Sequence, residues 1–236
     1  HGISPNARAL WDDAFAPGAQ ACGRALLMPR FDPENWPQFQ RIDKVRPDLA
    51  LLDLIHRAGL SGRKPDLFGF SGGAQLANRF AVLCPHRLGC LHLAAPGGYC
   101  LAQPDIAWPQ GLCRATGPRL RKFDAAALSR AQLSAYLALP VRIWVGAEDV
   151  LRDASLRQSR EVDAAQGHTR LDRAFRYADA FTTAAQARGI TPDIKITVLP
   201  RCGHGFIRCA EVGGLTTRIL QQHPVSRTKQ EEIITC

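Results

Sequence analysis

A serine between glycines is the first residue of this sequence whose setting suggests chemistry. Residues 69–73 have the sequence Gly-Phe-Ser-Gly-Gly, which places Ser71 at the centre of a Gly-x-Ser-x-Gly pattern. The pattern is specific only where a strand precedes it and a helix follows it. Residues 66–70 have the apolar character of a strand, and residues 72–83 have apolar side chains at helical spacing. We therefore expect Ser71 to be a nucleophile at a strand-to-helix turn, the alternative being a glycine-rich turn whose serine has no function.

A serine hydroxyl becomes a good nucleophile only when a base takes its proton, so an acid and a histidine are needed nearby. Asp149 follows a predicted strand at 141–145, and His204 follows a predicted strand at 193–199 between two glycines. The carboxyl ends of parallel strands meet at one edge of a sheet, where Ser71 must also lie. The order serine, acid, histidine therefore predicts that His204 is the base and that Asp149 orients it.

Other assignments remain open for both partners. Asp149 could be a turn former or a helix cap, and Glu148 and Asp153 are close enough in sequence to be the acid instead. His204 could be a solvated loop histidine, although flanking glycines are typical of a ring that must be freely presented. The remaining histidines lie within predicted elements, before the nucleophile or far from the required strand end.

The tetrahedral intermediate of such a reaction needs two backbone N–H donors for its oxyanion. Gly72, the residue after the nucleophile, is the first candidate. The second donor usually comes from an earlier loop that often begins His-Gly, and this chain begins His1-Gly2-Ile3. We expect Ile3 to be the second donor, with Gly2 as the fallback, and the strands before this loop to lie upstream of residue 1.

These segments together resemble those of a known superfamily. The chain is similar to α/β-hydrolases, in particular to small esterases like poly(3-hydroxybutyrate) depolymerases and the phospholipase/carboxylesterase group. The resemblance rests on segments in the order of that superfamily, namely residues 1–2, 69–73, 94–99, 146–149 and 203–205. It implies an α/β-hydrolase fold with a mostly parallel central sheet flanked by helices, here lacking its first strands. It also implies a serine hydrolase that cleaves a small-molecule or polymeric carboxylic ester through an acyl-enzyme, with no metal or organic cofactor.

The elements that must position these residues alternate along the chain as in a parallel α/β sheet. We expect one domain over residues 1–223, followed by a polar tail at 224–236. Strands are predicted at 25–29, 66–70, 88–95, 141–145 and 193–199. Helices are predicted at 48–58, 72–83, 125–139, 171–188 and 206–222, with Asp124 as the cap of the third.

The segment at 99–122 is irregular and contains several prolines and glycines. We expect it to form a lid, a cap insertion over 99–139 or one wall of the acyl pocket, the alternative being a packed surface loop. Trp36, Trp108 and Phe206 are candidate pocket residues, although aromatic side chains more often belong to the core.

Composition and charge argue against several other classes of protein. The chain has 236 residues, of which 46% are hydrophobic and 22% charged, as in an ordinary globular domain. No apolar run reaches the roughly 18 residues of a membrane helix. The net charge of +9 comes from scattered arginines rather than a cluster, which argues against nucleic-acid binding. The spacing of Cys84, His86, Cys90 and His92 fits no standard zinc site, so no metal is expected.

Three other functions are compatible with parts of this pattern. A peptidase or amidase of the same fold would have the same three residues and differ only in its pocket. A non-catalytic member of the fold would usually have lost the serine, the acid or the histidine. A basic nucleic-acid-binding protein is the alternative from a different class. The oligomeric state and the cellular compartment stay open.

Overall fold

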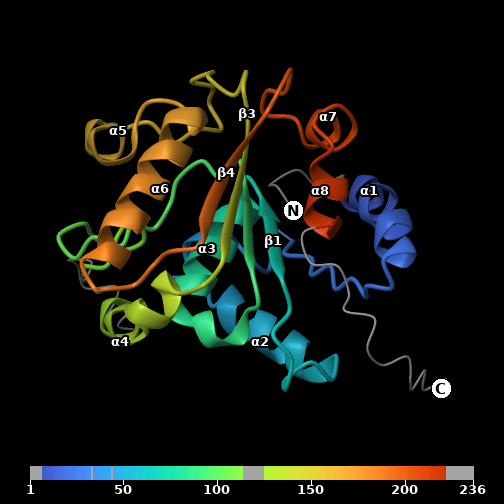
Figure 1. The fold of residues 1–236 in the computed structure, drawn as a ribbon, viewed down its shortest axis with the longest axis horizontal. Helices are drawn as coiled ribbons and strands as arrows, with labels where there is room; N and C mark the ends of the chain where they lie inside the picture. The colour runs from blue at the N-terminus through green and yellow to red at the C-terminus, as the bar shows by residue number, and fades with distance from the viewer. Residues whose placement is uncertain (1–6, 33, 44, 114–124, 222–236) are drawn as a thin grey trace.

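A computed structural model describes residues 7–32, 34–43, 45–113 and 125–221. Its centre is a parallel sheet of four strands in the order β1-β2-β3-β4 (Figure 1). The strands are β1 (Leu67–Phe70), β2 (Leu91–Ala94), β3 (Val141–Gly146) and β4 (Ile194–Leu199). Parallel strands require crossover connections, and the helices between them supply these.

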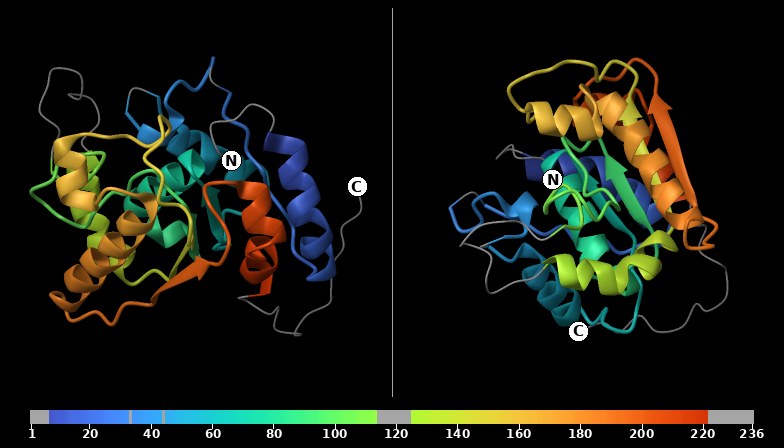
Figure 2. Two further views of the ribbon diagram at one scale, coloured as in Figure 1. Left: turned by 90° about the horizontal axis from the view of Figure 1, so that it is seen from above. Right: turned by 90° about the vertical axis from the view of Figure 1, so that its left-hand side faces the viewer.

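Helices cover both faces of the sheet, as the views in Figures 1 and 2 show. One layer contains α3 (Gly72–Leu83), α4 (Ala125–Leu137) and α6 (Arg170–Gln186). The other contains α1 (Ala7–Ala21), α7 (Phe206–Glu211) and α8 (Leu215–Gln221). The remaining helices are α2 (Pro47–Arg57), α5 (Arg160–Gln166) and the short 3₁₀ segments η1 (Phe39–Arg41) and η2 (Pro85–Arg87).

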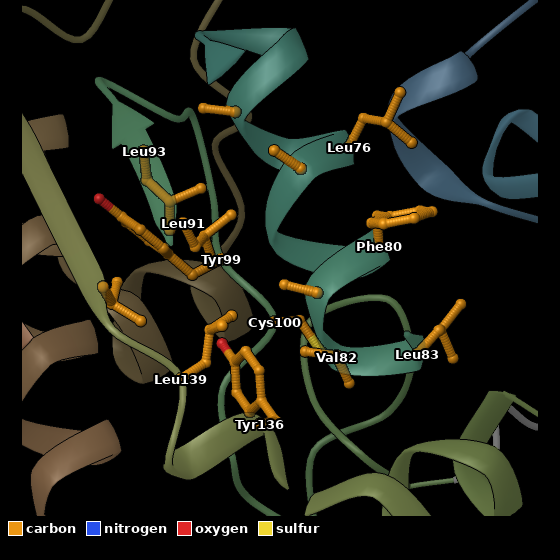
Figure 3. Close-up of a cluster of buried hydrophobic side chains, with 14 of the residues drawn as sticks. Leu76, Phe80, Val82, Leu83, Leu91, Leu93, Tyr99, Cys100, Tyr136 and Leu139 are labelled. Atoms are coloured by element: carbon orange, nitrogen blue, oxygen red, sulfur yellow. The ribbon is translucent and has the colours of Figure 1, made fainter. Parts of the chain in front are cut away.

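Alternation along the strands divides the core into two parts. Successive side chains of a strand point to opposite faces. Accordingly, Leu91 and Leu93 of β2 belong to the cluster beneath α3, whereas Ala94 belongs to the cluster beneath α1 and α8. Figure 3 shows the first cluster, in which Leu91 and Leu93 lie on one side of α3 and Leu76 and Phe80 on its other side. The central strands β2 and β3 are therefore largely buried on both faces, and functional groups must emerge at the strand ends.

The α/β fold with a parallel sheet and flanking helices confirms the prediction from the sequence. Helix α3 has the bounds predicted for it, and β1, β3 and β4 agree with prediction to within a residue or two. Within the described residues no strand precedes β1, and β1 pairs with β2 alone. Asp124, the predicted cap of α4, lies outside the described residues.

Two predictions about elements were wrong. Residues 25–29 form no strand: they have no regular structure, and Leu26, Leu27 and Met28 are exposed, so they have no core to pack against. The predicted final helix at 206–222 is two helices, α7 and α8, separated at residues 212–214. Gly214 there has a positive φ of 63°, which the interior of a helix does not allow. Helices α1 and α5 were not predicted.

No helix among the described residues combines the length and the apolar character that crossing a bilayer demands.

The approach of β1 to α3 generates a stability prediction. A Cβ on Gly69 would overlap backbone atoms of Gly73 and Ala74, which cannot move without shifting the start of α3. We expect Gly69→Ala to lower the free energy of unfolding by at least about 2 kcal/mol. Gly62→Ala is the matched control, since a Cβ there meets nothing within 4 Å. Urea denaturation of both variants measures the difference, and equal midpoints would contradict the close-packing argument.

Candidate active site

Ser71 lies at the turn between β1 and α3, where its backbone is strained. Its φ of 52° and ψ of −115° are unusual for a residue with a side chain. The Ser71 N–H donates to the carbonyl oxygen of Ala94 at 2.8 Å, which continues the β1–β2 ladder into the turn. This sharp turn leaves the side chain half-buried at the carboxyl edge of the sheet.

A chain of hydrogen bonds leads from Ser71 to an acid. The Ser71 Oγ lies 3.0 Å from Nε2 of His204, and Nδ1 of His204 lies 3.0 Å from Oδ2 of Asp149. An ionised carboxylate only accepts hydrogen bonds, so Nδ1 must carry the proton. Nε2 is then left as the acceptor for the serine hydroxyl. The ring is therefore oriented as a general base toward Ser71.

Backbone hydrogen bonds hold the two loops that carry these partners. We call residues 147–159 after β3 the acid loop and residues 200–205 after β4 the histidine loop; both lie at the top of Figure 1. The N–H of Ala147 donates to Leu199 at 2.9 Å, and the N–H of Glu148 donates to Cys202 at 2.8 Å. A Cβ on Gly146 would overlap the Cys202 carbonyl oxygen, so only glycine allows this approach.

Asp149 is also engaged from its other side, by a buried arginine. Asp149 and Arg170 are each only 1% exposed, and Nη1 of Arg170 lies 3.4 Å from Oδ1 of Asp149. The same guanidinium pairs with Asp153 at 3.2 Å and donates to Oγ of Ser155 at 2.6 Å. The hydrogen bonds from Arg170 and Ser155 hold the pKa of Asp153 well below its usual range. Arg170 therefore shares one positive charge between Asp149 and Asp153, two of the three carboxylates of the acid loop.

Two phenylalanines form an apolar wall beside the histidine. The ring of Phe70, the residue before the nucleophile, stacks on His204 with 5.5 Å between centroids. Phe206, at the start of α7, meets Phe70 edge-on at 5.5 Å. His204 keeps a side-chain exposure of 20%, so the wall covers one side of the ring and leaves the other accessible.

The structure brings together some of the predicted site residues and separates others. Asp149 contacts His204, whereas Glu148 is exposed and Asp153 pairs with Arg170. Gly72 is buried at the first position of α3, where backbone N–H groups have no partner within the helix. Ile3 and the fallback Gly2 lie outside the described residues.

The three predicted pocket aromatics do not form one group. Trp36 is half-buried and meets Phe31 edge-on, with 5.3 Å between centroids. Trp108 is buried, and its indole N–H donates to the carbonyl oxygen of Ile42 at 3.1 Å. Phe206 alone lies in the aromatic wall beside His204. The described part of the irregular segment, residues 99–113, contributes several buried side chains to the core.

A pocket of about 420 Å³ lies next to this constellation. Gln75 lines it and is tied to the nucleophile turn, since its N–H donates to the Ser71 carbonyl oxygen. Gly97 and Gly98 from the end of β2 and Ser155 from the acid loop form further parts of its wall. The pocket therefore borders both the nucleophile helix and the acid loop.

Within the described part of the chain, no cluster of three or more histidine, cysteine or acidic side chains is arranged to hold a metal ion. Of the residues weighed for zinc, Cys90 and His92 are buried on or next to β2, while His86 is exposed.

Sequence reasoning missed Arg170 and Phe70. Thr169 and Asp172 form a capping box at the start of α6, and the pattern Thr-x-x-Asp in the sequence is a signal for that helix start. It could have placed Arg170 in the first turn of a helix, but not beside Asp149. Phe70 occupies the variable position before the serine, and nothing in the pattern indicates a contact with His204.

This chain resembles known proteins in its structure, whereas comparisons of its sequence find no match. No protein-family model matches the chain, and no curated protein matches it in sequence. The structure is similar to LpqC, a poly(3-hydroxybutyrate) depolymerase from Bordetella parapertussis, with a TM-score of 0.72 and 26% identity over 90% of this chain and 76% of that one. It also has the fold of poly(aspartic acid) hydrolase-1 from Sphingomonas sp. KT-1, with a TM-score of 0.73 and 21% identity over 94% of this chain and 84% of that one.

Both neighbours are hydrolases, which supports a hydrolytic function of the α/β-hydrolase kind for this chain. The resemblance inferred from the sequence segments is confirmed at this level.

The buried pair of Arg170 and Asp149 generates a second stability prediction. Arg170→Met leaves Asp149 as a buried carboxylate without its arginine, and we expect it to cost about 3 kcal/mol of unfolding free energy. Asp153→Asn removes only the partner that is 41% exposed, so its cost is expected to stay below about 1 kcal/mol. Urea denaturation compares the two. Equal losses would mean that the Asp149 contact contributes nothing beyond the exposed pair.

Proposed function

We propose that this protein is a serine hydrolase that cleaves carboxylic esters with Ser71, His204 and Asp149 as its catalytic triad. The observation that carries the proposal is the continuous hydrogen-bonded chain from Asp149 through His204 to Ser71. The strained backbone of Ser71 supports it, because such strain persists where the surrounding structure maintains it for function.

In the first half of the reaction, Nε2 of His204 takes the proton of the Ser71 hydroxyl as Oγ attacks the ester carbonyl carbon. The carbonyl oxygen becomes an oxyanion, for which the N–H of Gly72 is one donor and, as predicted from the sequence, the N–H of Ile3 the other. Asp149 stabilises the imidazolium that forms. The imidazolium then gives its proton to the departing alcohol, and an acyl-serine remains.

The second half repeats these steps with water. His204 takes a proton from a water molecule, and the resulting hydroxide attacks the acyl-serine carbonyl. Collapse of the new tetrahedral intermediate breaks the bond to Oγ, the proton returns to Ser71, and the carboxylic acid leaves. Arg170 supports both halves as a positioning residue, because it holds Asp149 in a fixed place behind the histidine.

An ester is favoured over an amide as the substrate by the more similar of the two neighbours in sequence. LpqC is a depolymerase of poly(3-hydroxybutyrate), a polyester, and is 26% identical to this chain. The poly(aspartic acid) hydrolase is 21% identical, and at that identity it informs the fold alone. We therefore place small or polymeric hydroxy-acid esters first among the substrates to be tested.

The proposal predicts that Ser71→Ala abolishes hydrolysis of 4-nitrophenyl esters. Loss of the nucleophile is expected to reduce kcat by at least about 10³-fold, and His204→Ala by a similar factor. Ser61→Ala is a matched control, because Oγ of Ser61 also lies 2.9 Å from a histidine ring, that of His56, in an exposed pair. We expect this control to keep full activity.

The measurement is the release of 4-nitrophenolate from esters of graded acyl length, together with the corresponding 4-nitroanilides. Equal activity in wild type and Ser71→Ala would overturn the nucleophile assignment. Faster cleavage of the anilides than of the esters would overturn the ester class in favour of an amidase. The profile of kcat/KM against acyl length also gives the depth of the acyl pocket.

A further inference from the structure

The pocket beside Ser71 has an unusual charge. Three arginines line it, Arg41 from η1, Arg79 from α3 and Arg157 from the acid loop. None of the described residues that line it is acidic, and several of the others carry side-chain amides. A concave surface lined by one sign of charge concentrates ligands of the opposite sign. The charge of these arginines is available to a ligand only where no carboxylate of the protein neutralises it.

Arg79 differs from the other buried arginines in its partners. Arg170 pairs with Asp149 and Asp153, and Arg173 pairs with Asp163 at 3.0 Å. Arg79 is only 3% exposed, yet within the described residues it has no carboxylate partner. Burying an arginine without a counter-charge is costly, so such a cation points to an anion that the folded chain itself does not supply.

The hydrogen bonds of Arg79 hold its guanidinium in place without neutralising it. Nε donates to the carbonyl oxygen of Pro109 at 3.1 Å, and Nη1 donates to the carbonyl oxygen of Gln40 and, at 3.4 Å, to Oε1 of Gln75. No hydrogen bond from Nη2 is recorded among the described residues. Burial, together with the neighbouring charges of Arg41 and Arg157, lowers the pKa of Arg79 to about 10, so the group still carries its charge at neutral pH.

The carboxylates near the pocket are paired mainly with arginines outside it, although the exposed Glu161 of α5 interacts electrostatically with Arg157. Asp153 bonds Ser155 in the pocket wall, but its charge is paired with Arg170. Asp163, in α5 behind the wall, is paired with both Arg152 and Arg173. Arg41 is held by Oε1 of Gln38, a neutral group. The three pocket arginines therefore keep a net positive charge directed at whatever fills the pocket.

The position of the pocket relative to Ser71 limits which ligands can bind in it. Gln75 lies one helical turn after Ser71, about 6 Å along α3, and Arg79 lies one turn further. Helical side chains lean toward the N-terminus, and the bond from Arg79 to Gln75 agrees with this direction. A guanidinium that reaches back toward Gln75 therefore lies closer to the nucleophile turn than the backbone of Arg79 does.

We propose that the pocket lined by Arg41, Arg79 and Arg157 binds a carboxylate of the substrate, so that the enzyme prefers esters of acids that carry a second, free carboxylate. The inference rests on the proposed function, since it names the substrate class of that site. Arginine suits this task, because its planar guanidinium matches the two oxygens of a carboxylate.

Two matched substrate pairs test the inference. Mono-4-nitrophenyl glutarate against its neutral carboxamide analogue places the charge on the acyl side. 4-Butyryloxybenzoate against 4-butyryloxybenzamide places it on the leaving-group side. At low salt we expect wild type to prefer the carboxylate member of at least one pair by about tenfold in kcat/KM, and the preference to shrink as salt is added.

Variants locate the source of that preference. We expect the Arg41→Gln/Arg157→Gln double variant to reduce the ratio of the two kcat/KM values by about tenfold, and Arg79→Met to reduce it as well. Arg188→Gln removes an arginine after the far end of α6, which does not line the pocket, and should leave the ratio unchanged. A loss of folded enzyme lowers both kcat/KM values by the same factor, so it does not change their ratio. If Arg79→Met does not fold, the double variant decides alone.

The outcomes separate this inference from the proposed function. Equal cleavage within both pairs by wild type, with Ser71→Ala inactive, would leave the esterase standing and overturn the carboxylate pocket. A preference that survives in the double variant would also overturn it. If Ser71→Ala is as active as wild type, the proposed function fails, and calorimetric titration of glutarate decides the pocket. Binding that is lost in the double variant supports it, and absence of binding to wild type overturns it.

Discussion

The contact between the acid loop and the histidine loop is the constraint on which the site depends. Two backbone hydrogen bonds, from Ala147 to Leu199 and from Glu148 to Cys202, fasten the loops where β3 and β4 end. They form only because Gly146 has no side chain to meet the Cys202 carbonyl oxygen. With the loops fastened in this way, a hydrogen bond between Asp149 and His204 needs no further ordering of the backbone, so little entropy is lost in making it.

Ser71 is positioned at the same edge of the sheet by its backbone conformation rather than by a contact between loops. Ser71 is held in a backbone conformation that costs about 1–3 kcal/mol, and its ladder bond to Ala94 and the packing of α3 against the sheet offset this cost. Gly69 lets α3 begin directly against β1, so the turn stays sharp and the side chain rises from the sheet edge. Loop contact and strained turn together bring three residues far apart in sequence within hydrogen-bonding distance.

The sequence alone predicted those parts of the fold that are encoded locally. The pattern around Ser71 and the apolar periodicity of 72–83 specify β1, the turn and α3, and parallel topology then requires the later strand ends to meet them. Local patterns do not determine which remote side chains meet. Arg170 contacts Asp149 across 21 residues, and the helix break at Gly214 requires a positive φ that the helical periodicity around it does not reveal. Residues 25–29 are apolar, but no neighbouring strand pairs with them in the described structure.

The two ends of the acid loop contribute residues to different parts of the site. The buried Arg170 contacts both of these ends. Its first part carries Asp149 to the histidine, and its later part carries Ser155 and Arg157 to the pocket. Arg170 bonds Asp149, Asp153 and Ser155 at once, so the acid and the pocket wall share one anchor. Arg170 offsets one of the two negative charges of Asp149 and Asp153, so these carboxylates oppose the charge of the pocket arginines less than they would alone. The same ion-pair network that steadies the base therefore also helps the pocket to stay positive.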